Sequence, residues 1–252
     1  MATDTRCVLC STPTELFDRA RIMQKYDVDF HRCPGCGLIS LPDPTWLDEA
    51  YGPTIYAGDE GLLRRCRIQG LVTSAIIRSE GIRRGRFLDW AGGTGLLTRI
   101  MRDKGFDYYR NDPYIDNALA KGYDAEVEGH FDLVSAFEVV EHLADPIADM
   151  KAVADVTDRI FISTHLQPKD NPPKADDWWY YQLDSGQHIA LHTVESLTLL
   201  AEALGMQLTT DGDKYHVFHR VPLKPGTKLI LSRGLSSVRR GATDLARKAL
   251  GR

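Results

Sequence analysis

The sequence predicts an α/β domain built on an open, mostly parallel β-sheet, preceded by a small cysteine-rich module. Three observations predict it: strand-like apolar runs alternate with segments of helical periodicity, a glycine-rich turn joins the first run to a helix, and two paired-cysteine motifs stand near the amino terminus. The chain has 252 residues, 43% of them hydrophobic. That is enough to bury the core of one α/β domain and of a small appendage.

Apolar runs with helical segments between them give the pattern of a parallel sheet with right-handed crossovers. They are Arg86 to Trp90, Tyr108 to Asn111, Phe131 to Phe137 and Arg159 to Thr164, with a weak short strand near Ala125 to Val127. A helical run after Thr193 leads to two further strands, Met206 to Thr210 and Lys214 to Val221, around the turn Asp211-Gly212-Asp213. This hairpin ends the sheet in an antiparallel pair.

The most informative segment is the turn after the first strand, Asp89-Trp90-Ala91-Gly92-Gly93-Thr94-Gly95. Glycines allow positive φ and close approach of the backbone to a ligand, and the helix that follows supplies unpaired N–H groups. The spacing does not fit the Gly-x-Gly-x-x-Gly turn that holds a dinucleotide pyrophosphate. Asp89 at the strand end repels a pyrophosphate and attracts a cationic amine.

This turn resembles the first motif of class I S-adenosylmethionine (SAM) methyltransferases, an acid followed by three alternating glycines. Asp89, Ala91, Gly93 and Gly95 stand at those places, with Ala91 where the family has its first glycine. The resemblance implies a Rossmann-like sheet of seven strands and SAM as the cofactor. Asp112 ends the second strand about twenty residues later, where a carboxylate binds ribose hydroxyls.

Candidate catalytic residues follow the strands that end at Phe137 and Thr164, because ligands bind beyond the carboxyl ends of parallel strands. If a helical turn begins at Glu138, then Glu138, Glu141 and His142 share one face. The segment Gln167 to Leu191 is long for a connection, and such loops are usually functional. It contains His188, which can reach the same place, and the aromatic run Trp178 to Tyr181, which is either a platform on which a sugar or base stacks or a hydrophobic flap.

Two carboxylates and two imidazoles can hold a divalent cation, here Mg²⁺ or Mn²⁺. The set Glu138, Glu141, His142 and His188 resembles the metal cluster of small-RNA 2′-O-methyltransferases, where the cation lies beside the sugar hydroxyl. Many metal-free methyltransferases carry a similar Glu-x-x-Glu-His, whose first acid contacts the cofactor. Without a metal, His142 or His188 is the general base, so Glu141, His142 and His188 are the expected catalytic residues.

Two Cys-x-x-Cys motifs, 22 residues apart, predict a four-cysteine zinc ribbon. Its expected ligands are Cys7, Cys10, Cys33 and Cys36. Disulfides are the competing interpretation, and they are disfavoured because the amino terminus lacks the basic-then-apolar profile of a signal peptide. We therefore expect a cytoplasmic protein with reduced thiols, in which Cys66 is a buried core thiol on a helix.

The ribbon, the segment 51–56, the motif at 137–142 and the loop around His188 together resemble zinc-ribbon methyltransferases of bacterial glycan and deoxysugar pathways. The resemblance spans residues 7 to about 220 and implies a carbohydrate acceptor. The expected order is a zinc ribbon over 1–40, a helical lead-in and lid over 41–84, the methyltransferase domain over 85–221 and a basic tail over 222–252. Tyr51 and Tyr56 are candidate lid residues, and an amphipathic helix covers Asp59 to Gly81.

Three alternatives to a carbohydrate O-methyltransferase stay open. Sugar C-methyltransferases of this kind carry a further carboxyl-terminal domain. This sequence shows no counterpart of it, so we expect a hydroxyl acceptor and not a carbon acceptor. A ribosomal RNA methyltransferase with a zinc ribbon is disfavoured because residues 1–219 carry a net charge of −12. The third alternative, a non-catalytic binding module, is disfavoured by the intact Asp89, Asp112 and Glu141.

The carboxyl-terminal tail differs in charge from the rest of the chain. Residues 220–252 hold nine Lys and Arg against one acid, Asp244, whereas the whole chain has a net charge of −4. Apolar residues recur at helical spacing from Leu235 to Ala249, with cations around them. The tail resembles an interfacial helix, so we expect a peripheral contact with anionic lipid on the inner membrane face.

Overall fold

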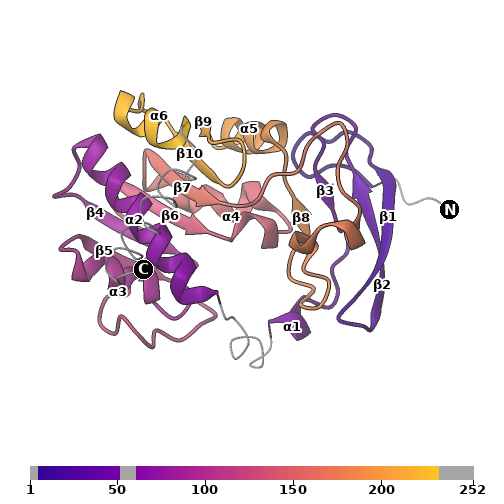
Figure 1. Cartoon of the computed structure of the whole chain (residues 1–252), viewed down its shortest axis with the longest axis horizontal. Helices are drawn as coiled ribbons and strands as arrows, with labels where there is room; N and C mark the ends of the chain where they lie inside the picture. The colour runs from indigo at the N-terminus through magenta and orange to yellow at the C-terminus, as the bar shows by residue number, and fades with distance from the viewer. Residues whose placement is uncertain (1–4, 52–60, 233–252) are drawn as a thin grey trace, which may run out of the picture.

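The computed structural model describes residues 5–51 and 61–232 as a large α/β domain with a small β-module beside it (Figure 1). The candidate lid residue Tyr56 and the apolar face of the basic tail lie outside the described residues. Within the two described stretches, no helix has the length and apolar character needed to cross a membrane.

The large domain is built on a six-stranded sheet in the order β5-β4-β6-β7-β10-β9. Strands β4 (Arg86–Trp90), β5 (Asp107–Asn111), β6 (Leu133–Phe137) and β7 (Arg159–Ser163) are parallel. The hairpin of β9 (Gln207–Thr210) and β10 (Tyr215–His219) adds the predicted antiparallel pair at one edge.

The described residues contain six strands in this sheet, whereas the resemblance implied seven. The segment near Ala125, expected as a weak strand, makes only one isolated parallel bridge, between Asp124 and Arg110 of β5. The carbonyl of the next residue, Ala125, accepts a hydrogen bond from the side-chain Nδ2 of Asn111 at 3.0 Å instead of from a strand neighbour's backbone. Acids dominate this segment, and acids are poor strand formers, so the pairing ends after one bridge.

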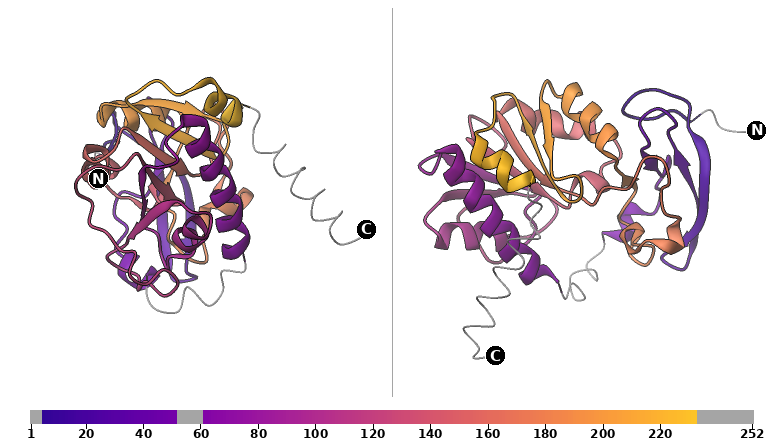
Figure 2. Two further views of the ribbon diagram at one scale, coloured as in Figure 1. Left: turned by 90° about the vertical axis from the view of Figure 1, so that its left-hand side faces the viewer. Right: turned by 45° about the horizontal axis from the view of Figure 1, so that its top comes forward.

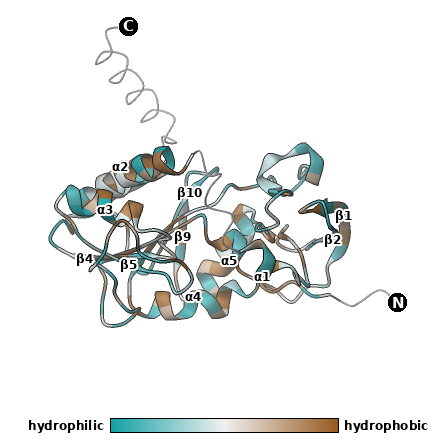
Figure 3. Cartoon of the chain, turned by 90° about the horizontal axis from the view of Figure 1, so that it is seen from below, coloured by the Kyte–Doolittle hydropathy of each residue, from teal (hydrophilic) through white to brown (hydrophobic). Residues whose placement is uncertain are grey.

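Helices cover both faces of the sheet (Figure 3). One face carries α2 (Leu62–Glu80), α3 (Leu96–Asp103) and α6 (Pro225–Ser232), and the other carries α4 (Pro146–Asp155) and α5 (Val194–Ala203). The central strands are buried on both sides: in β7, Phe161 packs under α2 and α3, whereas Ile160 and Ile162 pack under α4 and α5. This alternation follows from the two-residue period of a strand.

Local sequence signals fix where the helices begin and end. Asp145 accepts the Ala148 N–H at 3.1 Å with Pro146 in the first turn of α4, and Thr193 forms a capping box with Ser196 at the start of α5. Helix α2 ends at Gly81, whose φ of 74° is the left-handed conformation of a helix C-cap.

The small module is a four-stranded antiparallel sheet, and its last strand comes from far along the chain. Strands β1 (Glu15–Ile22), β2 (Tyr26–Arg32) and β3 (Ile39–Ser40) are followed in the sheet by β8 (Ala190–Leu191). Figure 1 shows the segment that leads to β8 lying against the module, and the right-hand view of Figure 2 shows the module beside the large domain.

The segment after β7, expected to be a long loop, thus forms part of the small module. It contains two short 3-10 turns, η3 (Ala175–Asp177) and η4 (Trp179–Tyr181), and its Tyr180 and Tyr181 join the core of the module with Phe30 and Trp46. The short helix α1 (Leu47–Ala50) closes that core. The ribbon therefore does not form its core from residues 1–40 alone.

Candidate functional site

The glycine-rich turn lies at the carboxyl end of β4, as predicted. Ala91, Gly93 and Gly95 all have positive φ, at 54°, 55° and 85°, and Gly95 is the N-cap of α3. A Cβ at Gly93 would meet nothing within 4 Å, so that side of the turn is open to a ligand. A Cβ at Gly95 would lie 2.7 Å from Asn117 Oδ1, so close packing requires glycine there.

Asp89 and Asp112 flank this turn. Asp89 is buried and accepts a hydrogen bond from Ser135 Oγ at 2.7 Å, and burial raises the pKa of its carboxyl to about 7. Asp112 lies at the turn itself, because its Oδ2 accepts the Gly93 N–H at 2.9 Å. Its Oδ1 accepts the N–H groups of Tyr114 and Ile115, so the carboxylate links the end of β5 to the glycine turn.

Arg110 is a site residue that sequence reasoning missed. It is buried on β5, with Nε donating to the carbonyl of Gly93 at 2.6 Å and Nη1 donating to Asp124 Oδ1, also at 2.6 Å. It also donates to the carbonyls of Asp112 and Ile115. The sequence did hold an indication, because Arg110 stands inside a strand that was predicted to be buried. A buried guanidinium needs several hydrogen-bond acceptors around it.

A second polar cluster lies beyond the carboxyl end of β6 and comprises Glu141, His142 and His188. One donor atom from each residue lies within 4.8 Å of the others. Glu141 is fully buried in η2 (Val140–His142), where its Oε1 accepts a hydrogen bond from Tyr180 Oη, while its Oε2 has no partner. Burial, reinforced by the carboxylate of Glu138, raises the pKa of Glu141 to about 8.

Both imidazoles of this cluster are held by hydrogen bonds. His188 Nδ1 lies 2.6 Å from the carbonyl oxygen of Tyr180, so Nδ1 carries the proton and Nε2 the lone pair. His142 Nδ1 is 2.7 Å from Tyr51 Oη, and its ring centre is 4.9 Å from that of His188. Burial lowers the pKa of His142 to about 3 and that of His188 to about 4, so both rings are neutral at pH 7.

Glu138, expected in the same set, lies apart from these three residues. Its φ of 54° breaks the backbone between β6 and η2, so no helical turn begins at Glu138 and the expected shared face does not form. Its Oε1 instead accepts hydrogen bonds from Ser163 Oγ at 2.6 Å and from Lys214 Nζ at 3.0 Å. Of the four expected residues, the structure groups Glu141, His142 and His188.

The four cysteines of the small module form a separate cluster. The Sγ atoms of Cys7 and Cys36 are 3.6 Å apart, and those of Cys10 and Cys33 are 3.4 Å apart. These separations are too long for disulfides and close to the roughly 3.8 Å between ligands of a tetrahedral Zn²⁺ with Zn–S bonds of about 2.3 Å. Cys66 lies elsewhere, on the buried face of α2, as expected.

The cysteine cluster and the His188 segment are joined directly. The carbonyl of Cys36 accepts a hydrogen bond from Thr193 Oγ1 at 2.6 Å, and Leu41 N donates to the carbonyl of Ile189 at 2.9 Å. Ile189 N in turn donates to the carbonyl of Glu141 at 2.9 Å. The small module therefore helps to position the chain on both sides of His188.

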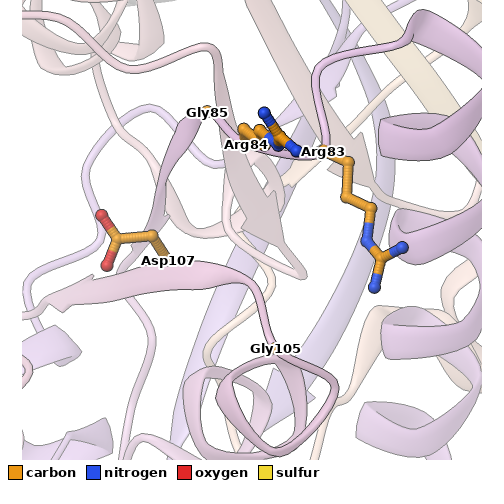
Figure 4. A pocket seen from close by; sticks show the side chains of 5 residues that line it. All are labelled: Arg83, Arg84, Gly85, Gly105 and Asp107. Carbon is orange, nitrogen blue, oxygen red and sulfur yellow. The ribbon is translucent and has the colours of Figure 1, made fainter.

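A hollow of about 480 Å³ lies at the opposite edge of the sheet, near the amino ends of β4 and β5. Its lining is Arg83, Arg84, Gly85, Gly105 and Asp107 (Figure 4). The side chains of Arg83 and Asp107 point in opposite directions, so they do not converge on one ligand. This hollow is also at the wrong end of the parallel strands for a ligand site.

Comparisons with known proteins identify the large domain. A family model described as a methyltransferase domain matches residues 64–211. No curated protein matches the chain. Among solved structures, an O-methyltransferase family protein from Burkholderia thailandensis is 13% identical with a TM-score of 0.53, over 71% of this chain and 63% of that chain.

Two further solved structures resemble the chain to a similar degree. TnmH is 17% identical with a TM-score of 0.50, over 70% of this chain and 61% of that chain. The mitomycin 7-O-methyltransferase MmcR is 14% identical with a TM-score of 0.50, over 70% of this chain and 60% of that chain. The chain spans less than two thirds of the length of these three structures, and at such low identity they show the shared fold alone.

Proposed function

This chain belongs to the methyltransferase-domain family and is a SAM-dependent methyltransferase, and we propose that it transfers the methyl group to a hydroxyl of a carbohydrate. The observation that supports this proposal is the cluster of Glu141, His142 and His188 at the carboxyl end of β6. The Nε2 lone pair of His188 there can accept the proton that a hydroxyl loses on methylation.

The proposed cofactor residues are those of the glycine turn and the two acids beside it. The open side of Gly93 would let the backbone approach the cofactor, and Asp112, which accepts the Gly93 N–H, would bind the ribose hydroxyls. Asp89, buried behind the turn, would supply negative charge in its ionised form. Ala91 and Gly95 supply the left-handed backbone that shapes it.

The proposed reaction is a direct displacement. The acceptor oxygen bonds to the methyl carbon of SAM, the carbon–sulfur bond breaks, and its electron pair stays on sulfur to give neutral S-adenosylhomocysteine (SAH). The hydroxyl proton passes to Nε2 of His188, the nitrogen left with a lone pair by the hydrogen bond to Tyr180. Glu141 and His142 hold the acceptor against this base.

A divalent cation, Mg²⁺ or Mn²⁺, is a second way to activate the hydroxyl at the same cluster. The unpartnered Oε2 of Glu141 favours it, because a buried carboxylate oxygen without a donor is a ready metal ligand. The cation would then lower the pKa of the hydroxyl, and His142 and His188 would be ligands. Turnover abolished by EDTA and restored by Mn²⁺ would select this mechanism, and turnover unchanged by EDTA would select the imidazole base.

We also propose that Cys7, Cys10, Cys33 and Cys36 bind a structural Zn²⁺. Four free thiols at tetrahedral separations support it, as does the backbone N–H of Cys36, which lies 3.5 Å from Cys33 Sγ. The metal would fix the turn at Cys36, whose carbonyl accepts a hydrogen bond from Thr193, the N-cap residue of α5. Metal analysis of the purified protein should give one zinc per chain.

The test of the proposed function uses labelled SAM with a panel of acceptors: methyl glycosides, oligosaccharides and ribosomal RNA. Methyl ethers on a sugar, located by hydrolysis and mass spectrometry, are the expected product. Label found on sugar carbon would indicate C-methylation instead. Label found only in RNA, with binding that weakens steeply as salt is added, would refute the carbohydrate proposal.

A further inference from the structure

The aromatic run Trp178 to Tyr181 divides into a buried part and one exposed ring. Tyr180 and Tyr181 are at most 1% exposed, and Trp178 is half-buried against both of them. Trp179 is 65% exposed. Trp179 is the one ring of these four that is mostly exposed, so the run is a core element that carries one exposed tryptophan.

The exposed ring of Trp179 is held in place by its neighbours. Its centre lies 5.4 Å from that of His165 and 5.3 Å from that of Tyr180, both in edge-to-face geometry. The 3-10 turn η4 ends at Tyr181, and its C-cap residue Gln182 has a φ of 48°. A tryptophan fixed in this way loses little conformational entropy when a ligand stacks on it.

Trp179 is also close to the proposed reaction centre. Its neighbour Tyr180 donates to Glu141, and the ring of Tyr180 lies 4.5 Å from that of His188. Its other neighbour, His165, is the second residue after β7, at the carboxyl edge of the sheet. Trp179 is thus two ring contacts from the imidazole base, within reach of a sugar unit linked to the one being methylated.

The charge around Trp179 decides which kind of ring it accepts. Asp213 is exposed and its Oδ1 lies 3.4 Å from His165 Nδ1, and Asp177 is exposed beside Trp178. The nearby cation, Lys214, is already paired with Glu138, and burial lowers the pKa of His165. Such surroundings repel a nucleotide pyrophosphate but accept hydrogen bonds from the hydroxyls of a neutral sugar.

We propose that Trp179 and Asp213 form a subsite for a second, neutral sugar ring, so that the acceptor is an oligosaccharide or longer glycan. The C–H face of the sugar stacks on the indole, whose π face carries negative charge, and a ring hydroxyl donates to the Asp213 carboxylate. This proposal rests on the proposed function, since it extends the acceptor beyond the hydroxyl that is methylated.

The experiment compares the kinetic constants of the wild-type protein with those of Trp179→Ala and Trp179→Phe. The acceptors are the oligosaccharide methylated best in the panel and the methyl glycoside of its methylated sugar. We expect Trp179→Ala to raise KM for the oligosaccharide about tenfold, as for loss of one aromatic stacking contact, with kcat and SAH affinity unchanged. KM for the methyl glycoside should stay the same, and Trp179→Phe should restore most of the loss.

Leu16→Ala is the matched control, because Leu16 is 50% exposed on β1 and belongs to none of these contacts. Equal KM changes for both acceptors, or none for either, would overturn the subsite. The Trp179 signal is the tryptophan fluorescence that the wild type has and Trp179→Phe lacks. If uridine monophosphate changes this signal and no oligosaccharide does, the site binds a nucleobase and the sugar subsite is overturned. If no glycan is methylated, the proposed function fails. The change in Trp179 fluorescence on adding the oligosaccharide panel then still tests whether Trp179 binds a sugar.

Discussion

Replacing Asp89 by asparagine should stabilise the protein at alkaline pH, although Asp89 belongs to the cofactor motif. The folded pKa of this buried carboxyl is about 7, against 3.8 for an ordinary aspartate. Between these values the folded chain keeps a proton that the unfolded chain has released. The free energy of unfolding therefore falls as pH rises through this window and stays low above pH 7.

The expected size follows from the two pKa values. Between pH 5 and pH 8, only the two units from pH 5 to pH 7 lie between the unfolded and folded pKa values. At about 1.36 kcal/mol per unit, the wild type loses about 2.7 kcal/mol of stability over them. Asp89→Asn has no charge to desolvate and keeps an oxygen for the Ser135 hydroxyl. The stability difference, variant minus wild type, should therefore be about 2.7 kcal/mol larger at pH 8 than at pH 5.

Urea unfolding followed by circular dichroism at both pH values measures this difference, and other titrating groups cancel because they are common to both proteins. Calorimetry with SAM should show weaker binding to the variant, since the carboxylate that favours the cationic donor is gone. A stability difference that is the same at pH 5 and pH 8 would refute the reasoning that burial controls this carboxyl.

Three further predictions follow from the turn, the cluster and the ribbon. Ala91→Gly should change the free energy of unfolding by less than about 1 kcal/mol, because relief of the positive φ offsets the gain in unfolded-state entropy; a loss above about 2 kcal/mol in urea would contradict this. His188→Asn should lower turnover at least about 100-fold with SAH affinity within twofold by calorimetry, and near-normal turnover would remove His188 from the centre. Cys33→Ser should lower the zinc content and speed hydrogen exchange across 186–191 with SAH affinity kept; unchanged exchange there would separate the ribbon from the site.

The sequence predicted the parts of the site that depend on short spacing. The glycine turn and Asp112 come together because adjacent parallel strands bring their carboxyl ends to one edge. The cysteine pairs come together because each knuckle is a local turn. The methyltransferase prediction is confirmed by the family match over residues 64–211.

Features that depend on distant pairing were not predicted. Strand β8 has two residues, too few to show a period, and its partner β3 lies about 150 residues earlier in the chain. The contact of Tyr51 with His142 joins residues 91 positions apart. Helical spacing predicted that Glu138 lies on one face with Glu141 and His142. Glu138 instead has a positive φ, which its sequence does not indicate, and its carboxylate pairs with Lys214.

The pairing of β3 with β8 limits how this architecture can be recombined. In order along the chain, the ribbon and the methyltransferase domain read as consecutive units, yet the strand that completes the first is encoded inside the second. Exchanging only the amino-terminal fifty residues between relatives would pair a foreign β3 with the native β8. A chimera that keeps its acceptor chemistry must therefore transplant residues 5–51 and 165–193 together.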